Sequence, residues 1–289
     1  MNLAIVILNW NGKNWLEKFL PNVILHSGNT DILVIDNAST DDSVSFLKEK
    51  FPAIKIVQNE KNYGFAGGYN EGLKKIEAEI YCLLNSDVEV TENWINPVLD
   101  LFQSDLSIAA VQPKVLDYHR RNYFEFAGAA GGFIDNLGFP YCRGRIFEDL
   151  EEDLGQYNDE TEIFWASGCC LFIRSQDFWD QNGFDQRFFA HQEEIDLCWR
   201  LKNSGRKIFY TGKSTIFHVG GGTLNKQSAQ KTFLNIRNNL SMILKNAPLH
   251  TLFWVIPARL ILDGFAEIYL GYKKGFSHVW AVIRARGSW

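Results

Sequence analysis

Short apolar runs rich in β-branched residues alternate with polar clusters and helical patterns along the first part of the chain. The runs cover residues 3–8, 32–35, 54–57 and 80–84. Strands that alternate with helical segments are typical of βαβ units, and right-handed crossovers join such strands into a parallel sheet. The pattern predicts an α/β fold with a Rossmann-like, mostly parallel central sheet flanked by helices.

Local signals add detail to this first half. Ser39 and Asp42 have the spacing of a capping box, which predicts a helix that starts there and ends before Pro52. The acidic stretch 148–153 predicts a solvated loop. Residues 162–174 predict a pair of strands around Ser167-Gly168.

The pattern becomes helical toward the end of the chain. Residues 193–203 have helical spacing, and two long helical patterns follow a glycine turn at 220–222. These patterns cover residues 228–245 and 249–272. We expect a main domain over residues 1–225 and a helical C-terminal extension over residues 226–289.

Polar residues gather where the predicted strands end. Ligands of parallel α/β sheets bind beyond the carboxyl ends of the strands. Asp36 can accept a hydrogen bond from a pyrimidine ring N–H there, while Asn9 and Asn11 can frame a base or ribose. Taken singly, each of these residues is equally explained as the cap of a strand or turn.

A glycine-rich segment lies between the third strand and a helix. It contains Asn62, Gly67, Gly68 and Asn70, and its small residues would let a ligand approach the N–H groups at a helix start. It is not the dinucleotide fingerprint, which directly follows a strand, usually the first. A structural turn is the alternative.

The tripeptide Asn85-Ser86-Asp87 directly follows a buried strand. A carboxylate in this position can bind Mg²⁺ or Mn²⁺, which also binds phosphate oxygens. Asp87 is therefore the candidate metal ligand. His218, at the end of a later strand, is a candidate metal ligand or phosphate donor, although a single histidine there is more often structural.

Three carboxylates fall within four positions at the start of the predicted helix 193–203. They are Glu193, Glu194 and Asp196. A solvated helix face is one interpretation. The strongly apolar flanks favour another, in which at least one carboxylate faces a cleft, where burial raises its pKa and suits it to general base catalysis.

Composition narrows the class of protein. The chain has 289 residues, 46% of them hydrophobic, which is enough for a buried core. A formal charge of −5 argues against nucleic acid as the main partner. The five cysteines lack C-x-x-C spacing and the apolar start is too short for a signal peptide, so we expect a cytoplasmic protein.

With these residues in place, the chain resembles the family 2 inverting glycosyltransferases of the GT-A fold, particularly the bacterial rhamnosyltransferase-like branch. The resemblance is an ordered series of segments over roughly residues 3–240. The matching segments are residues 6–12, 34–41, 62–70, 84–87, 167–168 and 193–200, followed by His218.

The resemblance implies a role for each matching position. Asp36 would bind the base, and Asn85-Ser86-Asp87 stands where the family has its D-x-D metal motif. Asn in the first position leaves Asp87 as the carboxylate ligand, with Asn85 nearer the ribose or diphosphate and His218 as an additional ligand. The family's catalytic base falls on Glu194, where the family has Asp, so Glu193 stays open as the alternative.

The same resemblance implies the partners. The donor would be a dTDP- or UDP-linked sugar, with rhamnose on a thymidine carrier as the first choice, and the cofactor a divalent Mg²⁺ or Mn²⁺. The acceptor would be a glycan or a lipid-linked glycan of cell-surface polysaccharide synthesis.

The predicted C-terminal helices have the composition of interfacial helices. The segment 249–272 is very apolar, but charged residues such as Arg259 and Asp263 argue against a membrane span. Basic residues such as Lys273 and Arg284 suit anionic headgroups. We expect peripheral contact with the inner face of the plasma membrane; a buried packing helix or a homodimer contact is the alternative.

Two other classes of protein are alternatives to a glycosyltransferase. A sugar nucleotidyltransferase would need a glycine-rich loop with Arg or Lys after the first strand, which Asn11-Gly12-Lys13 does not provide. A catalytically inactive carbohydrate-binding or partner-binding module on the same fold is the second alternative, and activity with and without Mn²⁺ separates it from an enzyme.

Overall fold

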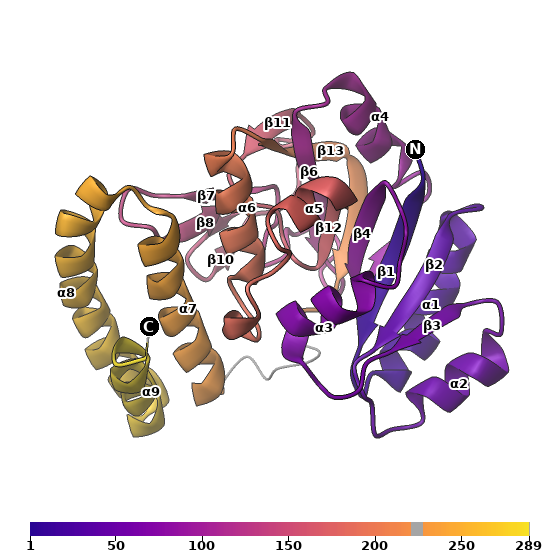
Figure 1. Cartoon of the computed structure of the whole chain (residues 1–289). Helices are drawn as coiled ribbons and strands as arrows, with labels where there is room; N and C mark the ends of the chain where they lie inside the picture. Colours follow the sequence, from indigo (N-terminus) through magenta and orange to yellow (C-terminus); the bar gives the residue numbers. More distant parts are fainter. Residues whose placement is uncertain (221–227, 289) are drawn as a thin grey trace.

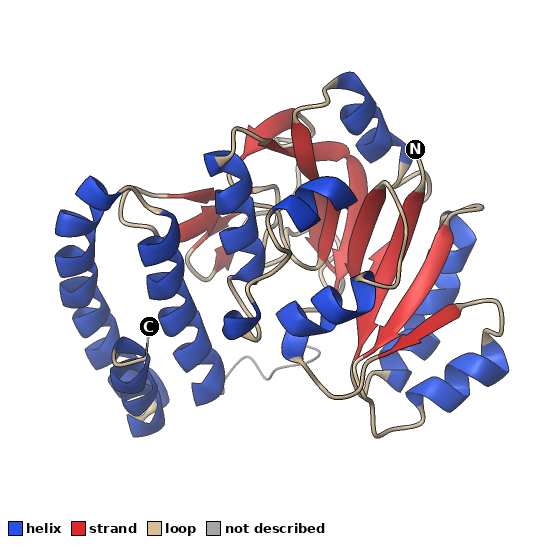
Figure 2. Cartoon of the chain, in the orientation of Figure 1, coloured by secondary structure: helices blue, strands red, loops and turns tan. Residues whose placement is uncertain are grey.

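A central β-sheet covered by helices on both faces forms the main body of the protein (Figures 1 and 2). The computed structural model describes residues 1–220 and 228–288. In this described part, the sheet has nine strands in the order β11-β13-β6-β12-β4-β1-β2-β3, with β5 added to β13. The prediction of a mostly parallel sheet flanked by helices is confirmed.

The first half of the sheet is built from parallel βαβ units. β1 pairs with β2 and β4, and β2 pairs with β3, all in parallel. The strands are β1 (Leu3–Asn9), β2 (Asp31–Asp36), β3 (Lys55–Gln58) and β4 (Ile80–Asn85). The crossover helices are α1 (Lys13–His26), α2 (Ser43–Lys50) and α3 (Gly64–Leu73). The register places Asn9 beside Asp36 and Leu8 beside Asn85, so the predicted polar positions do meet at one edge.

The second half mixes strand directions. β12 lies antiparallel between β4 and β6, whereas β13 runs parallel to β6. The strands are β5 (Val88–Val90), β6 (Ile108–Asp117), β11 (Glu160–Ile163), β12 (Cys170–Arg174) and β13 (Lys207–His218). The helices are α4 (Asn96–Ser104), α5 (Ser175–Asp180), the 3₁₀ turn η1 (Gln186–Phe188) and α6 (Glu193–Asn203).

The two faces of the sheet carry separate apolar cores. Helices α1, α2 and α4 bury Leu16, Leu47 and Phe102 against one face. Helices α3 and α6 bury residues such as Tyr69 and Leu197 against the other. Burial on both faces explains why the first strands are continuous apolar runs rather than alternating patterns.

Three local predictions need correction. The strands within 162–174 do not pair with each other, because β11 pairs with β13 and β12 with β4 and β6. The prediction of a capping box is wrong. The Ser39 hydroxyl accepts from the Asn11 N–H (2.9 Å), and Asp42 at the helix start makes no side-chain capping bond in the described structure. The acidic loop also contains a two-residue strand, β10 (Asp149–Leu150), paired with β9 (Arg145–Ile146).

Three helices follow the sheet: α7 (Ala229–Asn246), α8 (Leu249–Lys274) and α9 (Phe276–Arg286). Helix α7 contacts both α6 and α9, and α8 and α9 lie farther from the sheet (Figure 1). The predicted domain boundary at 225/226 and two of the three turn glycines lie outside the described residues. Of the helices in the described chain, none is long and apolar enough to cross a bilayer.

A small two-stranded sheet lies beside the main one. It pairs β7 (Gly132–Ile134) with β8 (Pro140–Cys142). All five cysteines lie in the described chain, where they are buried and unbridged.

Candidate active site

The ends of β1 and β2 hold a buried amide and a buried carboxylate side by side. The Asn9 Nδ2 lies 3.3 Å from Asp36 Oδ1 and 3.2 Å from the Ser39 hydroxyl. The Ser39 N–H donates to the other Asp36 oxygen at 3.1 Å. Asp36 is only 1% exposed, and both of its oxygens already have the internal partners described above. A base bound by Asp36 would share or replace these bonds.

Asn11 and the glycine-rich segment make bonds within the protein. Asn11 has a left-handed backbone (φ 51°), and its Oδ1 accepts from the Thr40 N–H at 2.7 Å, which joins two loops. Asn62 Oδ1 accepts from the Gly64 N–H at 2.8 Å. Asn70 donates to and accepts from the backbone of Phe184.

The two glycines of that segment are required by packing. A Cβ on Gly68 would lie 2.9 Å from Asn37 Nδ2, and one on Gly67 would lie 2.9 Å from the Tyr63 Cβ. Internal contacts therefore account for Asn62, Asn70 and both glycines. The predicted role of these four residues in donor binding stays a prediction.

Asp87 and His218 form the buried ionic centre of the site. The Asp87 carboxylate lies 3.3 Å from His218 Nε2, and the Asn85 Nδ2 lies 3.4 Å from the same nitrogen. The pairing of β13 with β5 brings them together, because His218 lies opposite Val88. The sheet thus brings Asp87 and His218, which are far apart in the sequence, into direct contact.

Burial and charge act in opposite directions at this centre. Burial alone would raise the pKa of Asp87, but His218 and backbone N–H groups lower it below its ordinary value. Burial would lower the pKa of His218, whereas Cys169, Asp87 and Glu125 raise it well above its ordinary value. The pair is therefore held as an ion pair within the protein.

Glu125 is a member of this centre that sequence analysis missed. Its Oε1 lies 3.6 Å from His218 Nδ1, and the residue is 4% exposed. Only its position in the irregular stretch after β6 places it there, and no spacing pattern marked it. Glu89, by contrast, pairs with Arg121 at 2.6 Å.

The donor chemistry of this centre fits a divalent cation that shares its coordination with a ligand. A carboxylate and an imidazole nitrogen suit Mn²⁺, and Mg²⁺ is commonly held by one or two carboxylates with phosphates and water. Within the described residues, no three His, Cys, Asp or Glu side chains form a metal-holding group. Asp87 can therefore supply one ligand, and His218 a second once cation binding displaces the proton that the ion pair holds on its imidazole. The remainder would come from diphosphate and water.

The segment from Ser167 to Cys169 connects this centre to the carboxylates of α6. The Asn85 N–H donates to the Cys169 carbonyl at 2.9 Å. A Cβ on Gly168 would lie 3.8 Å from the Glu194 Cβ. Gln112 holds the segment in place, accepting from the Ser167 N–H at 2.7 Å. The predicted metal residue and the predicted base thus lie on either side of one short segment.

Glu193 and Glu194 differ in their surroundings. Glu193 is 4% exposed, and burial followed by the charge of Glu194 raises its pKa well above the ordinary value. Burial raises the pKa of Glu194 to about 7, against backbone hydrogen bonds that lower it. Glu194 is partly exposed, so it can both reach a ligand and exchange a proton near neutral pH.

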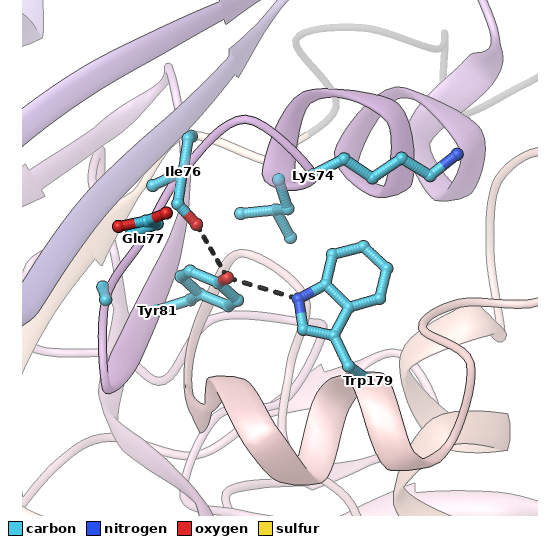
Figure 3. A pocket seen from close by; sticks show the side chains of 7 residues that line it. Lys74, Ile76, Glu77, Tyr81 and Trp179 are labelled. Carbon is cyan, nitrogen blue, oxygen red and sulfur yellow. Dashed lines mark hydrogen bonds between the residues drawn. The ribbon is translucent and has the colours of Figure 1, made fainter.

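A surface pocket of about 570 Å³ lies away from these residues (Figure 3). The Tyr81 hydroxyl in this pocket donates to the Ile76 carbonyl at 3.0 Å and lies 3.3 Å from Trp179 Nε1. Tyr81 is near the amino end of β4, whereas the candidate site follows its carboxyl end. The position therefore argues against this pocket as the active site.

The sheet, its helices and the polar edge define the GT-A fold of glycosyltransferases. The chain has a TM-score of 0.64 with the crystal structure of GalNAc-T7 with UDP, GalNAc and Mn²⁺, at 15% identity over 84% of this chain and 47% of that one. It has a TM-score of 0.61 with a mannosyltransferase of Pyrobaculum calidifontis in complex with GDP-Man and Mn²⁺, at 13% identity over 99% and 86%.

The chain belongs to glycosyl transferase family 2, whose sequence profile matches residues 4–182. It is 23% identical to the N-acetylglucosaminyl-diphospho-decaprenol L-rhamnosyltransferase of Mycobacterium tuberculosis, over 91% of this chain and 89% of that protein. It is 22% identical to a low-salt glycan biosynthesis hexosyltransferase of Haloferax volcanii, over 72% of this chain and 64% of that protein.

Proposed function

We propose that this protein is a metal-dependent inverting glycosyltransferase. It transfers a sugar from a nucleoside diphosphate sugar to a hydroxyl of a glycan or lipid-linked acceptor. The observation that carries this proposal is the partly exposed Glu194, with a pKa raised to about 7, across the Ser167–Cys169 segment from the buried Asp87–His218 pair.

In this proposal Glu194 acts as the general base. Its carboxylate takes the proton of the acceptor hydroxyl while the hydroxyl oxygen forms a bond to the anomeric carbon. The bond from that carbon to the diphosphate oxygen breaks, and the electron pair leaves with the nucleoside diphosphate. One displacement from the opposite face inverts the anomeric configuration.

Asp87 and His218 would hold the cation on the diphosphate side. A bound divalent cation offsets the negative charge of the departing diphosphate. Asn85 and Ser86 would contact the ribose or diphosphate, since they lie in the strand-end tripeptide that carries Asp87. Asn9 and Asp36 remain the candidates for binding the base, on the next two strands, β1 and β2, along the same edge.

A dTDP-linked rhamnose is the first donor to test, followed by UDP-linked sugars. The support for rhamnose is the name of the Mycobacterium tuberculosis relative, which also indicates a lipid-linked acceptor in that protein. By the same argument we place this chain in cell-surface polysaccharide synthesis.

The decisive experiment is a panel of nucleotide sugars screened with and without Mn²⁺. A ligand that binds only the folded protein raises its melting temperature, so thermal shift identifies the donor. Transfer to lipid-linked acceptors is then measured with that donor. Metal-dependent binding with transfer supports the proposal; binding without transfer or hydrolysis indicates an inactive module, and formation of a nucleotide sugar from a sugar phosphate indicates a nucleotidyltransferase.

We further propose that α8 and α9 contact the membrane surface peripherally. Trp254, Ile261, Phe265 and Tyr272 share one stripe of α8 by helical spacing, and each is at least 50% exposed. On α9, Trp280 is 54% exposed. Exposed apolar area of this extent marks an interaction surface.

A further inference from the structure

The backbone directly before the two candidate base residues is strained. Phe189, His191 and Gln192 have φ angles of 63°, 72° and 74°. Left-handed conformations are uncommon for residues other than glycine and persist only where surrounding contacts impose them. The contacts that impose this backbone therefore decide where α6 starts and where Glu194 lies.

Asn238 of α7 supplies the most concentrated of these contacts. Its Nδ2 lies within hydrogen-bond distance of three carbonyl oxygens in this loop, at 3.0 Å, 3.0 Å and 2.7 Å. The carbonyls belong to Phe188, Ala190 and His191. Asn238 is fully buried, so water does not compete for these bonds.

The preceding residue orients the amide. Arg237 Nε donates to Asn238 Oδ1 at 2.8 Å, which turns the Nδ2 group toward the loop. Arg237 Nη2 also donates to the Arg187 carbonyl at 2.9 Å. A neutral primary amide is needed here, because a carboxylate would lack N–H groups and face carbonyl oxygens.

The other side of the loop is fixed by α3. The Phe65 N–H donates to the Phe189 carbonyl at 2.7 Å. Gly64 has a φ of 73°, and a Cβ there would lie 2.6 Å from that carbonyl oxygen. The loop is therefore held between α3 and α7 just before it delivers Glu194.

We propose that Asn238 is a positioning residue for catalysis: it fixes the strained loop 188–192 and thereby aims the Glu194 carboxylate. The C-terminal extension is then part of the catalytic unit rather than only an attachment surface. This inference rests on the proposed function for its catalytic consequence, but the mechanical clamp is testable without turnover.

The test compares Asn238→Ala with Asn246→Ala in the full chain. Asn246 is a buried asparagine on the same helix that donates to Asp196 in α6 and to the Met242 carbonyl, and neither bond goes to a carbonyl of the loop 188–192. With the donor found in the panel, Asn238→Ala should lower kcat by about 100-fold while donor Kd stays near the wild-type value, because small misplacements of reacting groups cost that much. Asn246→Ala should lower the melting temperature and retain kcat.

Hydrogen exchange gives the second readout. Amides of residues 187–194 should exchange faster in Asn238→Ala and at the wild-type rate in Asn246→Ala. Wild-type kcat in Asn238→Ala, or unchanged loop exchange, overturns the inference. If the wild-type protein transfers no sugar, the proposed function fails, and exchange alone decides the clamp: faster loop exchange confined to Asn238→Ala supports it.

Discussion

At the scale of single residues, the burial of Glu194 opposes its ionisation. With a pKa of about 7, Glu194 is protonated in most of the protein molecules at pH 6. Because only the carboxylate can accept the acceptor's proton, we expect kcat to rise with pH and level off above about pH 8. A pH profile of transfer from about pH 5.5 to 9 measures this; a flat profile would contradict the base role.

Glu194→Gln removes the carboxylate of the proposed base and keeps the shape of the side chain. We expect it to abolish transfer and leave donor binding near normal, measured by initial rates and by donor titration. Glu193→Gln tests the alternative: loss of transfer in that variant, with turnover retained in Glu194→Gln, would assign the base to Glu193.

Glu194→Gln should also make the folded protein more stable than the wild type at alkaline pH. The pKa of Glu194 is raised from 4.5 to about 7, so the folded state binds a proton that the unfolded chain has lost in this range. Wild-type stability therefore falls as pH rises between these values. At pH 8 we expect Glu194→Gln to be more stable by roughly 1–3 kcal/mol, with the difference vanishing near pH 4 in urea unfolding.

Asp87 gives the metal-dependent prediction. Asp87→Asn keeps the side-chain size but removes the carboxylate that lies 3.3 Å from His218. We expect donor affinity in Mn²⁺ to fall at least about 10-fold, because a carboxylate is the stronger ligand for such an ion. Glu89→Gln is the matched control, since Glu89 pairs with Arg121. An unchanged Mn²⁺ titration in Asp87→Asn would remove Asp87 from the ligand set.

At the scale of elements, glycine contacts set how closely α3 approaches the sheet. A Cβ on Gly72 would collide with the Ile35 side chain of β2. Gly72→Ala should therefore destabilise the fold by about 1–3 kcal/mol in urea unfolding. Among the described residues, a Cβ on Gly264 of α8 would meet the Arg286 guanidinium alone, at 3.3 Å, so Gly264→Ala should be neutral or stabilising. Equal effects of both changes would refute the packing argument.

The elements that sequence predicted well are those with strong local patterns. The four apolar runs became β1 to β4 within one or two residues of their predicted ends, and α6, α7 and α8 followed their helical spacing. The carboxyl-end rule then placed Asn9 and Asp36 at the same edge of the sheet, where the register makes them neighbours.

The pairing of strands that are far apart in the sequence could not be predicted from local patterns. Nothing in residues 162–174 indicates that β12 inserts between β4 and β6, because its apolar run would suit a hairpin equally well. Glu125 reaches His218 only through that assembled sheet edge. Ser39 had a capping pattern, but its hydroxyl instead bonds the β1 loop, a tertiary contact that outcompetes the local one.

At the scale of the whole molecule, α7 connects the helix that carries the proposed base, α6, to the exposed helices. Its inner side holds the loop before α6, and its other side packs on α9, where Phe233 and Leu234 meet Ala281 and Ala285. The Arg259–Asp263 pair of α8 is buried, with Arg259 donating to the Leu137 carbonyl at 3.2 Å. The charges that argued against a membrane span therefore bind the helix to the protein.

The exposed stripe of α8 is what a peripheral membrane contact requires. Phe265 of the stripe is 67% exposed, Tyr269 beside the stripe is 61% exposed, and Lys273 is also exposed. Such a surface should bind vesicles that contain anionic lipid, and more weakly in high salt. We expect Phe265→Glu with Tyr269→Glu to abolish flotation with these vesicles, since burying two added charges in the headgroup region opposes binding.

Phe147→Glu with Leu154→Glu provides the matched control. These side chains are 88% and 80% exposed and lie outside α8 and α9, so the control adds the same charge without touching the stripe. It should float with vesicles as the wild type does. Sedimentation velocity without lipid tests the alternative of a homodimer contact. That alternative predicts that the wild type is a dimer, that the α8 variant is a monomer, and that neither floats with vesicles. The stripe would then be a homodimer contact, because the same apolar area cannot bind a membrane and a second copy at once.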